Sequence, residues 1–198
     1  MARYFLYASP VILSAAALAA TLTPSLPGGS AATPVAPTAT AVSATSLDTA
    51  LLNWDRLRQS DSFGFSDYAS FLLAHPGWPG EARMRRLAES KADPARETPA
   101  FVVSFFTRFP PSSAAGNARY ADALMITGRE AEATQAARSA WTGGNLSPDV
   151  ETRLMARFGR SFTATDHDQR MERLLSERAT GAAARQLPLV SAARQPIY

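Results

Sequence analysis

The sequence predicts an all-α protein built as a solenoid of short antiparallel helical hairpins. From residue 47 onward, residues that start and stop helices recur at short intervals, and no stretch shows the apolar–polar alternation of a strand. Roughly eight helices are expected, joined by loops of about two to eight residues, and connections this short make neighbouring helices antiparallel. A closed helical bundle is the alternative architecture, because short antiparallel helices build either one.

The hairpin expected over residues 117–141 favours the solenoid. Small and aromatic residues recur in it at fixed offsets, on two helices separated by Gly128. Alanines that face the partner helix let two helix axes approach closely, as in tetratricopeptide-like repeats. The residues expected at this contact are Tyr120, Ala121, Leu124, Ala133, Ala136 and Ala137.

The first element, residues 1–32, is expected to be a signal peptide. Arg3 is the only charged residue before position 48, and the segment 4–22 is apolar and rich in alanine. Cleavage is expected after the small-residue site Ala17-Leu18-Ala19 or later, after Ala32. The alternative is an uncleaved membrane anchor, because about 19 residues just span a bilayer. An interrupting proline and the many alanines favour the signal peptide.

Residues 33–46 are expected to form a flexible linker. They are rich in Pro, Ala, Thr and Ser and carry no charge. Such a segment buries too little apolar surface to offset its chain entropy. A secreted chain without cysteine and rich in arginine indicates the bacterial periplasm, with no membrane contact after signal cleavage. The helical domain is then expected over residues 47–198.

Three helices are expected in the first part of this domain. Ser46 caps the first, because an apolar stripe with helical spacing follows it. That stripe consists of Leu47, Leu51, Trp54 and Leu57. The second helix begins at Ser66 and ends at Pro76, which lacks the N–H that a helix interior needs. Pro79 suits the first turn of the third helix, where that N–H has no partner to lose.

The middle of the domain is expected to hold three further helices. The Thr98-Pro99 start and the ten-residue length of AFVVSFFTRF favour a mostly buried helix, although its composition would also suit a strand. Ser113 starts the next helix, which ends at Gly128, a residue typical of helix C-termini. The third covers residues 130–141 and ends at Gly143-Gly144.

Two helices complete the domain, and the second carries a cluster of titratable residues. Ser147-Pro148 starts the first with a cap and a first-turn proline. Thr165 is expected to cap the second, which begins Asp166-His167-Asp168-x-Arg170. This cluster has enough titratable groups for acid–base catalysis. A structural role is favoured, because acids stabilise a helix N-terminus and Arg170 can pair with Asp166 four residues away.

Composition excludes several kinds of functional site. Of the 198 residues, 46% are hydrophobic and 19% charged, which is enough apolar surface for a packed core. No cysteine is present, so disulfides, thiolate metal sites and cysteine nucleophiles are excluded. His75 and His167 do not have the spacing of a metal-binding pair, and no phosphate-binding glycine loop or serine-nucleophile motif occurs. No catalytic residue, cofactor or metal is therefore expected.

Two features of the sequence, its basic residues and its aromatic residues, could suggest polymeric ligands. Neither is strong evidence for one. There are 20 basic residues against 17 acidic ones, and all the basic residues but Lys91 are arginines. A net charge of +3 is too small an excess to indicate a nucleic-acid partner. Aromatic residues in the segments 63–78 and 101–109 could stack on sugars, but their spacing along helices is typical of a core.

Three strings resemble a known family. They are FGFSDYASFLLAHPGWPGEARMRRLAES at 63–90, FFTRFPPSSAAGNARYADALMITGREAEATQAARSAW at 105–141 and TATDHDQRMERLLSERA at 163–179. Their recurring elements are a His-Pro-x-Trp-Pro helix break, a Phe-Pro-Pro link, a Gly-Arg-x-x-Glu-Ala hairpin and an Asp-His-x-x-Arg helix start. In this order and spacing they resemble the N-terminal superhelical region of the soluble lytic murein transglycosylases of alphaproteobacteria.

The resemblance implies a right-handed superhelix of U or ring shape that belongs to an enzyme. In that family a separate lysozyme-like domain cleaves the MurNAc–GlcNAc bond of peptidoglycan without water and leaves a 1,6-anhydro product. Its catalytic Glu lies in a Glu-Ser pair, followed further on by Gly-Leu-Met-Gln. This chain contains Glu89-Ser90, but Lys91-Ala92-Asp93-Pro94 follows and Gly-Leu-Met-Gln occurs nowhere. We therefore expect Glu89 to be a scaffold residue, in a chain truncated before the catalytic domain.

The resemblance makes peptidoglycan glycan strands the expected partner. The chain is then the scaffold part of a periplasmic lytic transglycosylase and is inactive alone. A periplasmic helical-repeat adaptor, which binds a protein partner along its concave face, is the alternative. The segment 179–198 is expected to be exposed and mobile. A terminal repeat of a solenoid needs a polar outer face, and this segment is too apolar to provide one. It contains no acid, and its large apolar residues are Leu187, Leu189, Val190, Ile197 and Tyr198.

Overall fold

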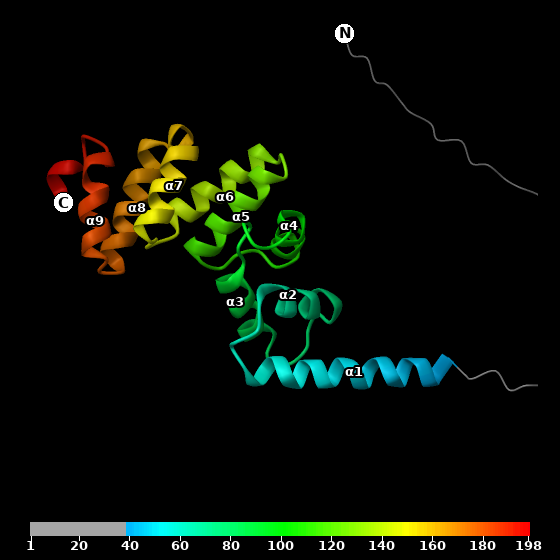
Figure 1. Cartoon of the computed structure of the whole chain (residues 1–198). Coiled ribbons are helices and arrows are strands. Elements are labelled where there is room, and N and C mark those ends of the chain that lie inside the picture. The colour runs from blue at the N-terminus through cyan, green and yellow to red at the C-terminus, as the bar shows by residue number, and fades with distance from the viewer. Residues whose placement is uncertain (1–38) are drawn as a thin grey trace, which may run out of the picture. The chain divides into compact units, whose positions relative to one another are not determined.

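The regular secondary structure of residues 39–198, the part of the chain that the structure describes, consists of helices alone (Figure 1). The structure is a computed structural model. Its α-helices are α1 (Ala39–Gln59), α2 (Phe65–Ala74), α3 (Glu81–Lys91), α4 (Pro99–Arg108), α5 (Ala114–Ile126), α6 (Glu130–Thr142), α7 (Pro148–Phe158), α8 (Ala164–Ser176) and α9 (Thr180–Gln186). Three short 3-10 helices are η1 (Gly159–Ser161), η2 (Leu187–Leu189) and η3 (Gln195–Ile197). The prediction of an all-α protein is confirmed.

Helices that follow one another along the chain pack together. α2 packs against α3, α4 against α5, and α5 against α6, while α8 packs against both α6 and α9. Figure 1 shows the helices succeeding one another in chain order from α1 to α9. Packing between sequence neighbours agrees with the predicted series of hairpins. The right-handed superhelix implied by the resemblance stays a prediction.

Helix α1 begins earlier than the sequence predicted. It starts at Ala39, so the second part of the expected linker 33–46 is helical and Ser46 lies inside the helix instead of capping it. No proline follows Pro37 in this stretch, and its alanines favour helix strongly. The predicted signal peptide, residues 1–32, lies outside the described residues. Among the helices of residues 39–198, none has both the length and the apolar composition needed to cross a membrane.

Three of the predicted helix starts are confirmed. Thr98 and Ser147 are the N-caps of α4 and α7, each followed by a proline at the first helical position. Ser113 caps α5, and its Oγ accepts a hydrogen bond from the N–H of Gly116 at 3.0 Å. The run that follows Thr98 is therefore a helix, as its Thr-Pro start predicted, and not a strand.

Helices α2 and α3 begin elsewhere than predicted. α2 starts at Phe65, where the Asp67 carboxylate accepts a hydrogen bond from the N–H of Gly64 at 3.0 Å. The expectation that Pro79 occupies the first turn of α3 is wrong. Gly80 is the N-cap of α3 with a φ of 82°, a left-handed conformation that favours glycine, and Pro79 lies in the turn before it.

The N-cap of α8 is Thr163 and not the predicted Thr165. Thr163 Oγ1 accepts a hydrogen bond from the N–H of Asp166 at 3.2 Å. In return, Asp166 Oδ2 accepts one from the N–H of Thr163 at 2.8 Å. This reciprocal arrangement is a capping box, which satisfies two N–H groups at the helix end at once. Thr165 therefore lies inside the first turn.

The α5–α6 hairpin has the predicted contact of small residues. Ala121, Leu124, Ala133, Ala136 and Ala137 are buried, and Tyr120 packs against them half-buried. Gly128 reverses the chain between the two helices with a φ of 76°, which residues with a Cβ rarely adopt. The close approach of α5 and α6 follows from the absence of large side chains between them.

Buried apolar side chains form two separate clusters within residues 39–198. The main cluster extends along the chain from Leu57 to Phe162. The second, which we call the terminal cluster, consists of Met171, Leu174, Ala182, Ala183 and Val190. Val190 is thus buried and not exposed as expected, because α9 and η2 pack against α8. Leu187, Leu189, Ile197 and Tyr198 are exposed as expected, and the mobility of this segment stays a prediction.

Candidate functional site

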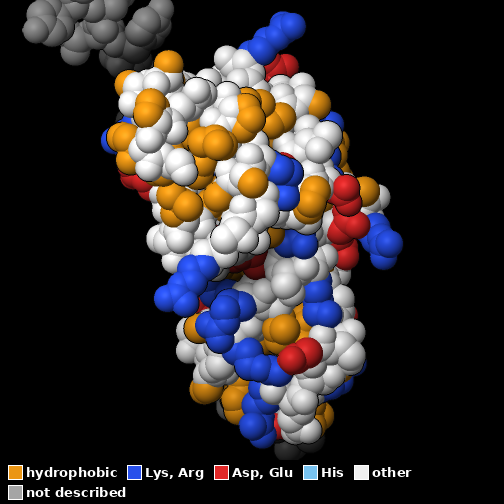
Figure 2. Space-filling view, turned by 90° about the vertical axis from the view of Figure 1, so that its left-hand side faces the viewer, with side chains coloured by type: hydrophobic (Ala, Val, Ile, Leu, Met, Phe, Trp, Pro, Cys, Tyr) orange, Lys and Arg blue, Asp and Glu red, His pale blue; other side chains and the backbone are white. Residues whose placement is uncertain are grey.

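A groove of about 1,010 Å³ lies where four segments of the described chain meet. They are the end of the α1–α2 loop with the start of α2, the end of α3 with the loop that follows it, α5, and α7 with the loop before it. Figure 2 shows Lys and Arg side chains gathered around a hollow on one face of the molecule. The groove is the strongest candidate for a binding site, because ligands bind in concave sites with convergent polar groups.

The lining of the groove combines cations with apolar residues. The cations are Lys91, Arg96, Arg119, Arg153 and Arg157, and the carboxylates are Asp93, Glu97 and Asp122. The apolar residues include Phe63, Phe65, Ala118, Ile126, Leu146 and Val150. Five cations against three carboxylates give the groove an excess of positive charge, so it attracts anionic groups.

Two arginines of α7 share one carboxylate of α5. Arg153 Nε and Arg157 Nη1 donate to Asp122 at 3.1 and 2.9 Å, respectively. Asp122 is buried, whereas both arginine side chains are nearly half exposed. One buried carboxylate thus holds two guanidinium groups in place, and one positive charge of the pair remains uncompensated at the groove surface.

A third arginine joins the end of α3 to α5. Arg119 Nη1 donates a hydrogen bond to the carbonyl oxygen of Glu89 at 3.1 Å. Because that partner is neutral, the guanidinium keeps its full charge beside the groove. Arg119 lies one turn before Asp122 on α5, so its side chain and the carboxylate that holds Arg153 and Arg157 are neighbours on one helix.

Glu89 has partners that the sequence did not predict. It lies in α3, as expected, but its carboxylate is buried and accepts hydrogen bonds from both serines at the start of α5. Glu89 Oε2 accepts from the N–H and Oγ of Ser112 at 3.0 and 2.8 Å. Glu89 Oε1 accepts from the N–H of Ser113 at 2.8 Å and from its Oγ. The carboxylate therefore ties α3 to the N-terminus of α5.

These contacts keep Glu89 ionised. Burial alone would raise the pKa of Glu89, but the hydrogen bonds from Ser113 and Ser112 outweigh it and lower the pKa below its usual value. A Cβ at position 116 would overlap the same carboxylate, so Gly116 is needed for this close approach. An ionised, fully hydrogen-bonded carboxylate has no proton to donate, so the geometry does not suit a general acid.

The titratable residues at the start of α8 are engaged in contacts within the protein. The predicted pairing of Asp166 with Arg170 is wrong. Asp166 pairs instead with Arg138 of α6 at 3.1 Å, and Arg170 Nη2 pairs with Glu151 of α7 at 2.7 Å. Arg170 points into the interior, away from the surface where an i, i+4 pair would form. The structural role assigned to the acids does hold for Asp166, which completes the capping box of α8.

Arg170 is one of the most deeply buried side chains among residues 39–198, at 1% exposure. Its Nη1 donates to the carbonyl oxygens of Trp141 and Gly144 at 2.8 and 3.0 Å. Its guanidinium carbon lies 4.1 Å from the centre of the Trp141 ring, a cation–π contact. Burial lowers the pKa of Arg170, while Glu151 opposes that shift. Arg170 therefore fixes α8 against the end of α6 and α7.

The surroundings of His167 favour its neutral form. Its Nδ1 accepts a hydrogen bond from the indole Nε1 of Trp141 at 3.2 Å. Burial lowers the pKa of His167 below its usual value, although Asp166 and Asp168 act in the opposite direction. Trp141 and His167 thus form part of the packing between α6 and α8.

His75 lies at the end of α2 and packs on aromatic rings. Its ring centre is 4.9 Å from that of Phe71 and 5.4 Å from that of Trp78. The two histidines therefore belong to different packing contacts. Within residues 39–198, no group of three or more His, Cys, Asp and Glu side chains is placed to hold a metal ion.

Most aromatic residues that could have stacked on sugars pack inside the main cluster. Phe65 makes edge contacts with Phe101 and Phe105, with ring centres 5.5 and 5.3 Å apart. These distances are typical of aromatic pairs in protein interiors. Phe63 and Phe65 are the aromatic residues that also line the groove.

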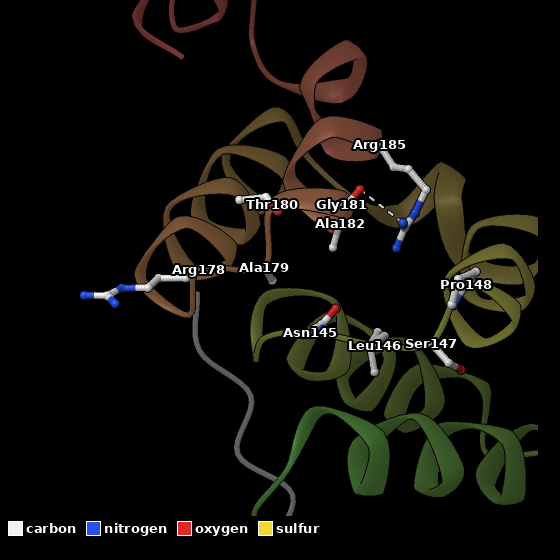
Figure 3. A pocket seen from close by; sticks show the side chains of 10 residues that line it. All are labelled: Asn145, Leu146, Ser147, Pro148, Arg178, Ala179, Thr180, Gly181, Ala182 and Arg185. Carbon is white, nitrogen blue, oxygen red and sulfur yellow. Dashed lines mark hydrogen bonds between the residues drawn. The ribbon is translucent and has the colours of Figure 1, made fainter.

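A second hollow, of about 550 Å³, lies between the α6–α7 loop and the α8–α9 turn (Figure 3). Two arginines line it, Arg178 and Arg185, and Arg185 is already engaged within the protein. Arg185 Nη1 donates to the carbonyl oxygen of Gly181 at 3.1 Å, and its Nε pairs with Glu151 at 2.9 Å. On the opposite side, the N–H of Asn145 donates to the Glu177 carboxylate at 2.8 Å. One of its two arginines is therefore engaged, and the hollow has about half the volume of the groove, so it is less suited to an anionic ligand.

The sequence analysis did not predict the groove, although the spacing of two of its arginines could have indicated part of it. Arg153 and Arg157 are four residues apart on one predicted helix, so a shared face could have been read from their spacing. Their partner Asp122 comes from a helix two elements earlier, and no local pattern connects the two. Arg119 and Lys91 join the same groove only through the packing of α3 against α5.

Comparisons with known proteins assign no family to this chain. No family model matches it, and neither a curated protein nor a solved structure matches it significantly. What the chain does is therefore inferred from the chemistry of the groove and from the sequence resemblance described above.

Proposed function

We propose that the chain is the scaffold part of a periplasmic lytic transglycosylase, and that its groove holds peptidoglycan while a separate domain cleaves it. The observation that carries this proposal is the groove, which presents cations and apolar residues from four segments of the described chain. The sequence resemblance supplies the kind of polymer. Secretion through the signal peptide predicted at residues 1–32 would bring the chain to that polymer.

The contacts of Glu89 support a scaffold role for this chain. A glycosidic bond is cleaved with a carboxylic acid that carries a proton and reaches the substrate. Glu89 stands in the Glu-Ser pair that resembles the family's catalytic motif, yet its carboxylate is buried, ionised and bonded to Ser112 and Ser113. In this proposal Glu89 shapes the groove wall by joining α3 to α5, and catalysis takes place elsewhere.

Co-sedimentation of the full chain with insoluble peptidoglycan sacculi tests the proposal. The natural chain is expected to sediment with the sacculi, and loss of the two α7 arginines is expected to weaken binding about tenfold, or about 1.4 kcal/mol. The variant combines Arg153→Gln and Arg157→Gln with Asp122→Asn, so that no buried carboxylate is left without a partner.

The matched control is Arg160→Gln, which removes one charge from η1, outside the groove lining. It is expected to bind as the natural chain does. The proposal fails if the natural chain stays in solution, or if the groove variant and the control bind equally. Release of anhydro-muropeptides by this chain alone would contradict the scaffold role.

A further inference from the structure

The arginines of the groove have hydrogen-bond donors left for a ligand. A guanidinium group carries five N–H donors in a planar fork that matches a carboxylate. The bonds to Asp122 engage the Nε of Arg153 and the Nη1 of Arg157, and the bond to the Glu89 carbonyl engages the Nη1 of Arg119. Arg153 and Arg157 are also nearly half exposed, so their remaining N–H groups are open to solvent.

The same groove offers apolar surface between its cations. Ile126 of α5 is largely exposed, and Val150 of α7 is half-buried. Both line the groove together with Leu146 and Phe63. A ligand that fits must therefore place carboxylates against the arginines and aliphatic groups against the apolar residues. An extended peptide with acidic groups has this chemistry, whereas an unmodified sugar chain does not.

Peptidoglycan contains both kinds of chain. Its glycan backbone carries hydroxyl and acetamido groups and no charge where the lactyl groups are joined to peptides. Its short stem peptides carry free carboxylates and aliphatic side chains. A volume of about 1,010 Å³ lies at the upper end of the range for small-ligand pockets, which is large enough for a short peptide.

We propose that the groove recognises the carboxylates of peptidoglycan stem peptides, with Arg119, Arg153 and Arg157 as the binding residues. This inference rests on the proposed function and names the part of the polymer that is bound. Asp122 acts as the positioning residue, because it holds two of the three guanidinium groups in place from below. The groove then contacts the polymer through the charges of the peptides and not through the glycan backbone.

The experiment compares ligands on the natural full chain, so that it does not depend on the folding of a variant. Binding is measured to soluble glycan strands that carry their stem peptides, and to the same strands after an amidase has removed the peptides and the lactyl carboxylates that this frees have been converted to amides. A third ligand is the strand with its peptide carboxylates converted to amides. Affinity is expected to fall at least about tenfold for the stripped and the amidated strands, and salt is expected to weaken binding of the intact strands alone.

The outcomes separate this inference from the proposed function. If stripped or amidated strands bind as tightly as intact ones, the inference is overturned while the proposed function stands. If no strand binds, both fail. Binding of intact strands alone, reduced by Arg153→Gln with Asp122→Asn and unchanged by Arg160→Gln, supports both and assigns the contact to the groove.

Discussion

Glu89 shows how one buried carboxylate can hold two helices together. Replacing it by Gln puts an NH₂ group where an oxygen accepts two hydrogen bonds from Ser112 or Ser113. The serine hydroxyls can rotate to accept, but a backbone N–H cannot, so one buried donor is left without a partner. Glu89→Gln is therefore expected to lower the free energy of unfolding by about 1–3 kcal/mol at pH 7, measured by urea denaturation.

The pH dependence of this effect has a defined direction. Because the pKa of Glu89 is lower in the folded chain than the usual 4.5 of a glutamate, the contribution is complete above about pH 4.5. It is lost as the pH falls through the folded pKa, so the natural chain and the Gln variant should converge in acid. Glu130→Gln, at the exposed start of α6, is the control and should change stability little. A Glu89→Gln deficit that is the same at every pH would contradict this account.

Arg170 is expected to contribute far more to stability than an exposed arginine of the same helix. Arg170→Met removes a buried ion pair and two bonds to backbone carbonyls, so unfolding should become easier by about 3–5 kcal/mol. Arg173→Met is the matched control, because Arg173 forms an exposed pair with Glu177 on the surface of α8. Its expected effect is below about 1 kcal/mol in the same urea titration. Equal effects of the two substitutions would show that Arg170 is not the contact that fixes α8.

The burial of Arg170 could have been anticipated in part. It precedes Leu174 by four residues, so the two share a face of α8, and Leu174 is buried. A charged residue on an apolar face must find a buried partner, but Glu151 lies on another helix, and the sequence contains no local sign of it. The pairing within the helix, with Asp166, was therefore preferred and was wrong. Local rules describe neighbours on one helix and not contacts between helices.

At the scale of the helices, the capping box of α8 makes a direct prediction. Thr163→Ala removes the hydroxyl that accepts from the N–H of Asp166, which should lower stability by about 0.5–2 kcal/mol. Thr165→Ala, inside the first turn, keeps the capping box and should have little or no destabilising effect. Both are measured by thermal and urea unfolding. A larger loss for Thr165→Ala would mean that the helix begins where the sequence first placed it.

Helix starts were predictable where a polar cap precedes a proline or a clear apolar run. Thr98, Ser113 and Ser147 all cap helices as expected. The start of α1 was missed because Ala, Thr and Ser serve both linkers and helices, and only the last proline, Pro37, marks the boundary. The start of α3 was missed because both Pro79 and Gly80 suit a helix beginning, and the left-handed φ of Gly80 decided between them.

For the described molecule as a whole, two apolar clusters imply two levels of stability. The terminal cluster is small and contains no aromatic residue, whereas the main cluster contains a set of large aromatic residues. Hydrogen exchange should therefore show lower protection in α9 than in α4, by at least about 1–2 kcal/mol of opening free energy. Equal protection in a monomer would mean that both clusters unfold as one unit.

The groove could not have been predicted from the sequence, although the helices that build it were. Its lining runs from Ser62 to Arg157 and gathers short pieces of several helices and loops. Which pieces meet depends on how each hairpin packs on the next, and apolar periodicity does not determine that packing. The all-α fold followed from local signals, while the binding surface depends on the tertiary arrangement.

The contact of Arg170 with α6 and α7 has a consequence for how the chain responds to temperature. Apolar clusters lose stabilising free energy on cooling, because the hydrophobic driving force weakens. The penalty for removing a guanidinium and a carboxylate from water falls on heating, so the Arg170–Glu151 pair is least costly when the protein is warm. In the cold, α9 should therefore loosen from α8 while Arg170 still holds α8 in place. On heating, the Arg170–Glu151 ion pair should be among the last contacts of the C-terminal helices to break.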